Sequence, residues 1–374
     1  MLTSKRTRRL ASLALAIGTL LPSLAVLAPE ASGAATAPKV TTLTLKQAKP
    51  YTPTAPNGGT DDYHCSLVNP NVKKDSYIVS AQFFPNSPEV HHAILFLIPP
   101  SSVAAAKKAN VGGKGWTCFG ETALPGTGLA QLAQTPWLTA WAPGHGKDVH
   151  TKGAGTLLPA GSMVVMQVHY NMLRGDKPVT SSLKLNTVPV SKAIQPETLG
   201  QYVAPPNVPC PSGITGPLCD RTASLADLAK RFGPGATMFD SAIQSICGNP
   251  APGVTTTCTW HPRQTGWVVR VAPHMHLTGR ALSMTLDPGT SKQVTLLDDT
   301  NYNFDDQKAI ALKHPVKITS ADTIKLSCTY DPTLRQKLPQ LRSQAPRFIT
   351  WGDGSSDEMC LGLIMTVPNK PAGA

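Results

Sequence analysis

The apolar residues of this chain fall in short runs separated by proline and glycine, and this pattern limits the fold more than any other feature. The chain has 35 prolines and 30 glycines. The runs are rich in β-branched residues and have the lengths of strands. They occupy residues 77–83, 93–98, 163–170, 182–188, 266–272, 280–286, 293–297, 323–330 and 359–365. The sequence therefore predicts an all-β fold built from antiparallel sheets.

The length of the chain predicts two domains. A chain of 374 residues is too long for one ordinary sandwich and suits two domains of roughly 150 residues. We expect two jelly-roll-like antiparallel β sandwiches in tandem, at residues 61–195 and 196–374. A disulfide-stapled insertion at about 205–262 carries four cysteines and one predicted helix, Ser224–Phe232, which is closed by Gly233 and Pro234.

The first 35 residues have the composition of a signal peptide. Basic residues precede an apolar stretch at residues 10–27, and small residues at 31–35 offer a cleavage site. The alternative, a transmembrane anchor, is disfavoured by Pro22 and by the small-residue site. Residues 36–60 are predicted to be a flexible leader, rich in Pro, Thr, Ala and Lys. We expect a secreted or extracytoplasmic protein without a stable membrane anchor, and the Sec and twin-arginine export routes both stay open.

The cysteines point to the same compartment. Eight cysteines follow the signal peptide, and an even number in an exported chain predicts four disulfides. A zinc site is the alternative, but no two cysteines have the C-x-x-C spacing. Counting alone does not fix the pairing of Cys65, Cys118, Cys210, Cys219, Cys247, Cys258, Cys328 and Cys360.

The formal net charge of +12 says little about function. Lysine and arginine are scattered, with no basic run outside the signal peptide and no recognisable nucleic-acid-binding module. We therefore expect a solvated basic surface and no nucleic-acid partner.

Candidate metal ligands lie in or beside the predicted strands. His274 and His276 are two residues apart, so both imidazoles point to the same face of an extended strand. His169 closes the run 163–170 and shares its face with Gln167, which is placed to orient a ligand or a water. His91 and His92 precede another run, but neighbours face opposite sides of a regular strand.

Both members of the His91-His92 pair can ligate one ion only at a β-bulge or at a strand end. Met359, taken alone, is typical of a core residue. The other five histidines are assigned no metal role because they lie in loop-like stretches, at His64, His145, His150, His261 and His314.

Five short motifs occur in order along the chain. They are His91-His-Ala-Ile-Leu-Phe, Gln167-Val-His-Tyr, His274-Met-His-Leu-Thr-Gly-Arg, Ser327-Cys-Thr-Tyr and Asp357-Glu-Met-Cys. With these motifs, over residues 63–367, the chain resembles the copper type II, ascorbate-dependent monooxygenases, the family of dopamine β-monooxygenase and the peptidylglycine α-hydroxylating monooxygenases. It looks like a bacterial-type secreted member closer to the dopamine branch.

The resemblance implies two copper ions per chain. The first, which relays electrons, would be held by His91, His92 and His169. The second, which binds and activates oxygen, would be held by the catalytic residues His274, His276 and Met359. This ligand chemistry suits copper, because imidazole serves both of its oxidation states and a thioether favours Cu(I).

The resemblance also implies a reaction in which R–H, oxygen, two protons and two electrons from ascorbate, the external reductant, give R–OH and water. We therefore expect a secreted dicopper monooxygenase that hydroxylates a C–H bond of a small organic substrate. Its partners would be the small-molecule substrate, oxygen and an electron donor. The alternative is a secreted copper-binding β-sandwich protein without hydroxylase turnover. The substrate, the physiological reductant and the oligomeric state stay open.

Two disulfides are implied by the resemblance, Cys65–Cys118 and Cys328–Cys360. Proximity in the sequence alone suggests that the other four cysteines pair with their near neighbours, as Cys210–Cys219 and Cys247–Cys258.

The resemblance implies a difference in substrate as well. Peptide-amidating relatives hold the substrate carboxylate with an arginine and a tyrosine, at positions that correspond here to Ala272 and Leu363. Arg270, on the same strand face as Ala272, is a candidate substitute. The residues that share the face of Met359, at Leu361, Leu363 and Met365, are either plain core or the apolar wall of a pocket.

Overall fold

The structure is a computed structural model that describes residues 39–55, 60–119, 122–124 and 137–372. The predicted signal peptide, residues 1–35, lies outside the described residues. Among those described, no helix is long and apolar enough to cross a membrane.

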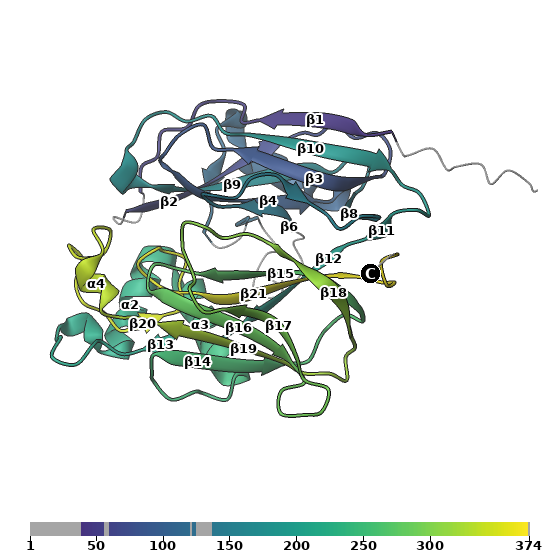
Figure 1. Cartoon of the computed structure of the whole chain (residues 1–374). Helices are drawn as coiled ribbons and strands as arrows, with labels where there is room; N and C mark the ends of the chain where they lie inside the picture. The colour runs from purple at the N-terminus through teal and green to yellow at the C-terminus, as the bar shows by residue number, and fades with distance from the viewer. Residues whose placement is uncertain (1–38, 56–59, 120–121, 125–136, 373–374) are drawn as a thin grey trace, which may run out of the picture. The chain divides into compact units, whose positions relative to one another are not determined.

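Two sheets form the first half of the chain (Figure 1). The six-stranded sheet has the order β1 (Thr41–Lys46), β10 (Ser182–Pro189), β3 (Ser76–Phe84), β8 (Ala154–Leu158) and β11 (Gln195–Pro196), with β7 (Asp148–Val149) also paired to β3. The five-stranded sheet has the order β5 (Trp116–Thr117), β2 (Asp61–Val68), β9 (Met163–Asn171), β4 (Val90–Ile98) and β6 (Trp137–Trp141).

Two four-stranded sheets form most of the second half. One has the order β12 (Thr198–Val203), β21 (Cys360–Val367), β15 (Gly266–Met275) and β18 (Ile310–Ile318). The other has the order β14 (Thr255–Trp260), β19 (Ile324–Tyr330), β16 (Gly279–Leu286) and β17 (Val294–Asp299). A two-stranded pair joins β13 (Asn207–Val208) to β20 (Ile349–Thr350).

Both halves repeat one strand order. In the first half, β1-β10-β3-β8 face β2-β9-β4-β6, and in the second half β12-β21-β15-β18 face β14-β19-β16-β17. When the eight main strands of each half are counted along the chain, the two sheets read 1-8-3-6 and 2-7-4-5, which is the order of a jelly roll. The prediction of an all-β fold of antiparallel sandwiches is therefore confirmed.

Each half buries a separate apolar core between its two sheets. In the first half, Ile78 and Leu183 of one sheet pack against Leu95 and Val168 of the other. In the second half, the core includes Val268 and Ile364 from one sheet and Leu282 and Leu326 from the other. Side chains at alternate positions of these strands point inward, as the short apolar runs predict.

The prediction of a flexible leader over residues 36–60 is wrong for β1. Thr41–Lys46 pairs with β10 along its whole length, and the side chain of Leu45 is buried in the first core. The segment alternates threonine with leucine, which is the pattern of a strand with one face buried. Its composition, rich in Pro, Thr and Lys, concealed this alternation.

The predicted helix in the insertion is confirmed as α2, Arg221–Phe232, which begins three residues earlier than expected. Asp220 caps it by accepting a hydrogen bond from the backbone N–H of Ala223. Pro234 does not end the helical region, because it occupies the first turn of a second helix, α3 (Pro234–Ile246), where its missing N–H costs nothing.

The predicted insertion, 205–262, also extends too far, since β14 belongs to the second sandwich. Two of the histidines that the sequence analysis placed in loop-like stretches lie in strands instead, His64 in β2 and His314 in β18.

The remaining helices are short: α1 (Val103–Ala109), α4 (Leu334–Lys337) and the 3-10 helices Pro100–Ser102, Val111–Gly113, Met172–Arg174 and Pro217–Cys219.

All four predicted disulfides are formed, between Cys65 and Cys118, Cys210 and Cys219, Cys247 and Cys258, and Cys328 and Cys360. The last bond joins β19 of one sheet to β21 of the other across the second sandwich. It therefore fixes the start of the strand that directly follows Met359.

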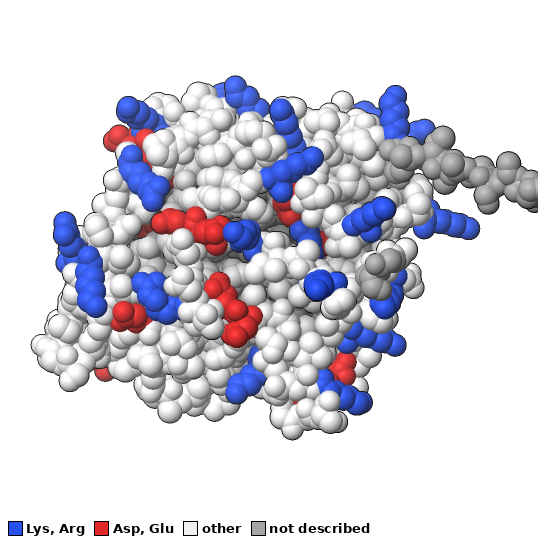
Figure 2. Space-filling view, in the orientation of Figure 1, with Lys and Arg blue, Asp and Glu red and all other residues white. Residues whose placement is uncertain are grey.

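Charged side chains are dispersed over the surface drawn in Figure 2. Lysine and arginine side chains stand apart from one another on this face, and acidic side chains gather near its middle.

Candidate metal centres

A β-bulge at His91 turns two neighbouring histidines toward one point. Val90 of β4 lies opposite Tyr170 of β9, and His92 lies opposite His169, so His91 has no partner of its own in the ladder. An extra residue on one strand re-aims the side chains around it. The structure therefore has the irregularity that the sequence required for His91 and His92 to share an ion.

Three imidazoles converge at this bulge. The Nδ1 atom of His92 lies 3.2 Å from Nδ1 of His91 and 3.0 Å from Nδ1 of His169. All three side chains are buried, and one nitrogen atom from each lies within 4.8 Å of the other two. Neutral imidazoles cannot satisfy three such nitrogens with one another, whereas one soft cation accepts all three lone pairs. The donor set fits copper.

Asp61 and Tyr63 of β2 hold the His169 ring. The Asp61 Oδ1 atom accepts a hydrogen bond from Nε2 of His169 at 2.8 Å, which leaves Nδ1 of His169 as a lone-pair donor. The Tyr63 ring stacks on the His169 ring with centroids 4.1 Å apart. Burial alone would raise the pKa of Asp61, but hydrogen bonds from His169 and Ser355 lower it, so the carboxylate stays ionised.

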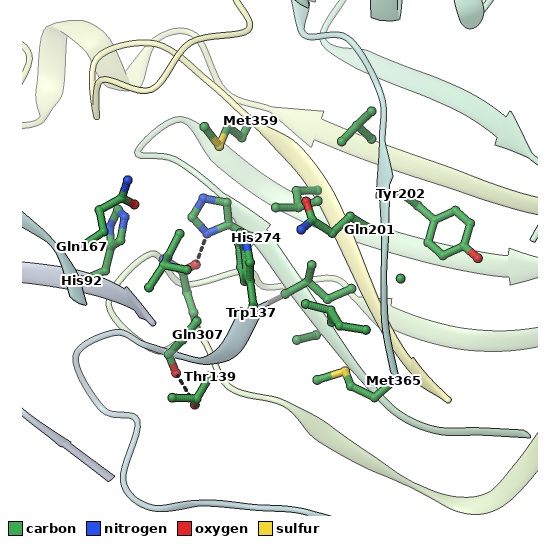
Figure 3. Close-up of a pocket in the computed structure, with 18 of the residues that line it drawn as sticks. His92, Trp137, Thr139, Gln167, Gln201, Tyr202, His274, Gln307, Met359 and Met365 are labelled. Carbon is green, nitrogen blue, oxygen red and sulfur yellow. Dashed lines mark hydrogen bonds between the residues drawn. The ribbon is translucent and has the colours of Figure 1, made fainter. Parts of the chain in front are cut away.

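The second group of ligands lies at the end of β15. His274 Nδ1 donates to Oε1 of Gln307 at 2.6 Å, and the Gln307 amide is oriented by donating to the carbonyl of Phe304 (Figure 3). His276 Nδ1 lies 3.3 Å from the carbonyl oxygen of Asp357. Because both partners are acceptors, both Nδ1 atoms carry hydrogen and both Nε2 atoms present lone pairs.

Met359 completes this group. The antiparallel register pairs Met275 with Cys360, so Met359 lies across from His276. In Figure 3 the bend of the Met359 side chain at its sulfur is on the side of the His274 ring, and both residues line the cavity. Two imidazoles and a thioether form a donor set that suits Cu(I), whereas zinc has no reason to select the thioether.

The residues beside Met359 anchor it to three different parts of the molecule. The Glu358 carboxylate accepts hydrogen bonds from the backbone N–H groups of His276 and Thr278, at 2.8 and 2.6 Å. Asp357 is held by two bonds from Arg231, each of 2.7 Å. Cys360 is in the disulfide across the second sandwich. The thioether is therefore placed beside His276 by rigid neighbours.

Burial lowers the pKa of four candidate ligands, namely His91, His92, His274 and His276. Desolvation disfavours a charged imidazole, and it lowers the pKa of His274 to about 4 and that of His276 to about 3. The pKa values of His91 and His92 are also well below the ordinary value, first because of burial and then because of neighbouring histidines. These imidazoles are neutral at pH 7, which is the state that binds a metal.

The two groups lie beside one cavity of about 1330 Å³. The ring centroids of His92 and His274 are 6.1 Å apart. A second link joins the groups, because the Ser355 hydroxyl, in the segment before Met359, donates to Asp61 Oδ1 at 2.9 Å.

Arg270 cannot take the place of a substrate-binding arginine, contrary to the sequence-based suggestion. Its guanidinium is buried and paired with Asp148 and Glu197, and Glu197 also accepts a hydrogen bond from His150. Burial alone would raise the pKa of Glu197, but His150 and Arg270 together lower it to about 2. The positive charge of Arg270 is thus already neutralised.

The six side chains that the sequence predicts as ligands lie in two groups, but the sequence did not predict the residues that orient them. Gln307 lies in a loop and Asp61 begins a strand far from His169 in sequence, so neither had a local signal. Gln167 lines the cavity near His92, as Figure 3 shows.

Three comparisons with known proteins bear on these sites. The sequence pattern of the family described as copper type II ascorbate-dependent monooxygenase, C-terminal domain, matches residues 250–371. That region contains His274, His276 and Met359. None of the curated proteins matches the sequence.

Solved structures show only remote overlap. The major capsid protein P2 from bacteriophage PM2 has 10% identity and a TM-score of 0.30, over 87% of this chain and 98% of that one. Allantoicase from Saccharomyces cerevisiae has 8% identity and a TM-score of 0.20, over 85% and 80% of the two chains. These scores are too low to carry an argument. The family match and the motifs within it therefore agree, and residues 250–371 form a C-terminal domain of the copper type II ascorbate-dependent monooxygenase family.

Proposed function

We propose that this protein is a secreted dicopper monooxygenase that hydroxylates a C–H bond of a small organic substrate, with oxygen and an ascorbate-type reductant. The observation that carries the proposal is the pairing of two different donor sets beside one cavity. One consists of three imidazoles and the other of two imidazoles and a thioether. A protein that only stored copper would have no need for two unlike sites that face each other.

In this proposal His91, His92 and His169 hold the copper that relays electrons. The three side chains are buried, and Asp61 and the Tyr63 ring fix His169 in one orientation. A site held this rigidly changes its geometry little when its charge changes, which favours rapid electron transfer.

His274, His276 and Met359 hold the second copper, where the substrate reacts. Copper bound there supplies oxygen activation and one-electron chemistry. The chain contributes the rest: Gln307 and the Asp357 carbonyl keep both Nε2 atoms free of hydrogen, and Glu358 holds the turn that carries His276. The cavity beside Met359 admits the substrate and shields it from bulk water.

Secretion is supported by the disulfides. Four disulfides and no free cysteine among the described residues are typical of a chain that folds in an oxidising compartment. This agrees with the signal peptide predicted at residues 1–35.

The test is metal analysis followed by oxygen uptake. The mature protein should bind two copper ions, and with ascorbate it should consume oxygen when a substrate is supplied from a panel of phenethylamines, acylglycines and neutral aromatic or aliphatic compounds. The hydroxylated product is identified by mass spectrometry with ¹⁸O-labelled oxygen. Two tightly bound copper ions without any substrate-dependent oxygen uptake would instead favour a copper-binding protein without turnover.

A further inference from the structure

We propose that the substrate is an uncharged, largely apolar molecule that lies along one sheet face and presents a single neutral polar group to Gln201. This inference rests on the proposed function and narrows its substrate class. Three observations support it. They are the strand register of the cavity floor, the neutralised or peripheral position of the charged side chains around that floor, and the Gln201 side-chain amide, which has no hydrogen-bond partner within the described residues.

The floor of the cavity is the outer face of the sheet β12-β21-β15. Residues directly opposite one another in antiparallel strands point to the same face. The register therefore gives three rows, and all nine side chains line the cavity. The rows are Val203, Leu361 and His274; Gln201, Leu363 and Ala272; and Leu199, Met365 and Arg270.

The rows run from the proposed oxygen site to the Arg270 ion pairs. The first row contains the candidate ligand His274, and the last row lies four residues further along the strands, a distance of about 13 Å. Between them the side chains are aliphatic apart from Gln201. An extended molecule with one end beside Met359 would thus contact mainly carbon.

Aromatic and aliphatic groups also face this floor. Ile243 of α3 and Trp351 belong to one apolar cluster with Leu361 and Leu363, and Trp137 packs against the same cluster. Figure 3 shows Trp137 close to His274 and Gln201. A ligand here would be held between apolar surfaces, where burial of carbon supplies the binding energy.

The charged side chains that line the described part of the cavity leave no place for a charged ligand on the floor. Arg270 is neutralised by Asp148 and Glu197. Arg263 and Lys308 are exposed, so they lie at the rim. Burial raises the pKa of Asp353 to about 7, and this residue lies on the segment before Met359 rather than on the floor. A buried charge without a partner is costly.

Gln201 is the exception in the middle row. Its side-chain amide has no hydrogen-bond partner within the described residues, and Figure 3 shows this amide directed into the cavity on the side of His274. An amide offers both a donor and an acceptor. It therefore suits a hydroxyl, carbonyl or amide group of a neutral substrate, and it would place that group at a fixed distance from the reacting carbon.

The test compares three ligands that share a ten-carbon chain, namely 1-decanol, decanoate and decylamine. Displacement of the neutral dye Nile red is measured on the copper-loaded mature protein, and also on the metal-free mature protein, because a carboxylate or an amine can bind copper directly. We expect 1-decanol to displace the dye at concentrations at least tenfold lower than the two charged ligands. Tighter binding of decanoate would overturn the inference. Tighter binding of decylamine would also overturn it and would favour Asp353 as the contact.

Two variants test whether 1-decanol binds on the cavity floor. Leu363→Arg places a charge in the middle row and should weaken binding of 1-decanol at least tenfold. Leu199→Arg, on the edge strand β12, makes the same change where folding is less at risk. Val111→Arg is the matched control, because Val111 is exposed and does not line the cavity. If both floor variants bound 1-decanol as the wild type does, the inference would be wrong.

The outcomes separate this inference from the proposed function. Binding of 1-decanol without ascorbate-driven oxygen uptake supports the ligand class and contradicts the monooxygenase. Oxygen uptake with charged substrates alone supports the monooxygenase and contradicts the ligand class.

Discussion

The imidazole rings of His92 and His274 lie 6.1 Å apart, although one ring projects from the first sandwich and the other from the second. Each ring is nevertheless oriented by its own neighbours. His274 is fixed by Gln307, and the group around His92 is fixed through Asp61. The two sites are therefore adjacent in space, but their proposed ligands are different residues, and this makes them separable by mutation.

Loss of one ligand set should remove one copper and leave the other. We expect His169→Ala and His274→Ala each to lower the copper content from two ions to about one, measured by mass spectrometry of the desalted protein. His314→Ala is the control, because His314 is exposed on β18 and should keep both ions. Loss of both ions from either single variant would argue against separate sites.

The thioether of Met359 should matter for Cu(I) and for turnover more than for folding. Met359→Ile keeps similar bulk, so the free energy of unfolding should fall by only about 1–2 kcal/mol. Cu(I) affinity at the second site should drop and hydroxylation should fall by orders of magnitude, while ascorbate still reduces the first site. Met365→Ile, further along the same strand face, should keep wild-type Cu(I) affinity. Hydroxylation by Met359→Ile at the wild-type rate would make Met359 a core residue only.

Gln307 should act through His274. Gln307→Leu removes the acceptor that fixes the His274 tautomer, and loss of such a contact typically lowers metal affinity by about 10–100-fold. Cu(I) competition titration measures this, and Gln336→Leu, a change on an exposed glutamine, is the control. The role assigned to Gln307 is incorrect if its variant binds Cu(I) as the wild type does.

Copper binding at the second site should depend little on pH between 7.5 and 5. A proton competes with the metal only below the pKa of the imidazole, and burial lowers the pKa of His274 to about 4 and of His276 to about 3. An imidazole with an ordinary pKa near 6.5 would cost about 30-fold in affinity over this range. Cu(I) competition titrations of His169→Ala at several pH values isolate the site. A steep loss of affinity between pH 7 and pH 5 would contradict the burial argument.

The disulfide between Cys328 and Cys360 should support the second copper as well as the fold. Replacing both cysteines by serine should lower the free energy of unfolding by about 2–5 kcal/mol and also weaken Cu(I) binding, because the strand after Met359 loses its anchor. The same double change at Cys210 and Cys219 should leave copper binding intact. Equal Cu(I) affinities in the two variants would show that the bond does not position Met359.

The sequence predicted the parts of this molecule that depend on local pattern. Residue periodicity predicts the strands with alternating inward and outward side chains, and it predicts the helix at Ser224–Phe232. It also shows that His91 and His92 can share an ion only if the strand is irregular at His91. The strand at Thr41–Lys46 was missed because it is stabilised by pairing with β10, a contact 136 or more residues away. Asp61 and Gln307 were missed for the same reason, since their contacts to histidines form only when distant segments meet.

The two jelly rolls share one strand order but do not carry their proposed ligands on the same sheet. The three-histidine group lies on β4 and β9, in the 2-7-4-5 sheet of the first half, while His274 and Met359 lie at the ends of β15 and β21, in the 1-8-3-6 sheet of the second half. The halves therefore meet through non-equivalent faces. Two copies of the first half would lack His274 and Met359, and two copies of the second half would lack the three-histidine group. Neither half can therefore substitute for the other.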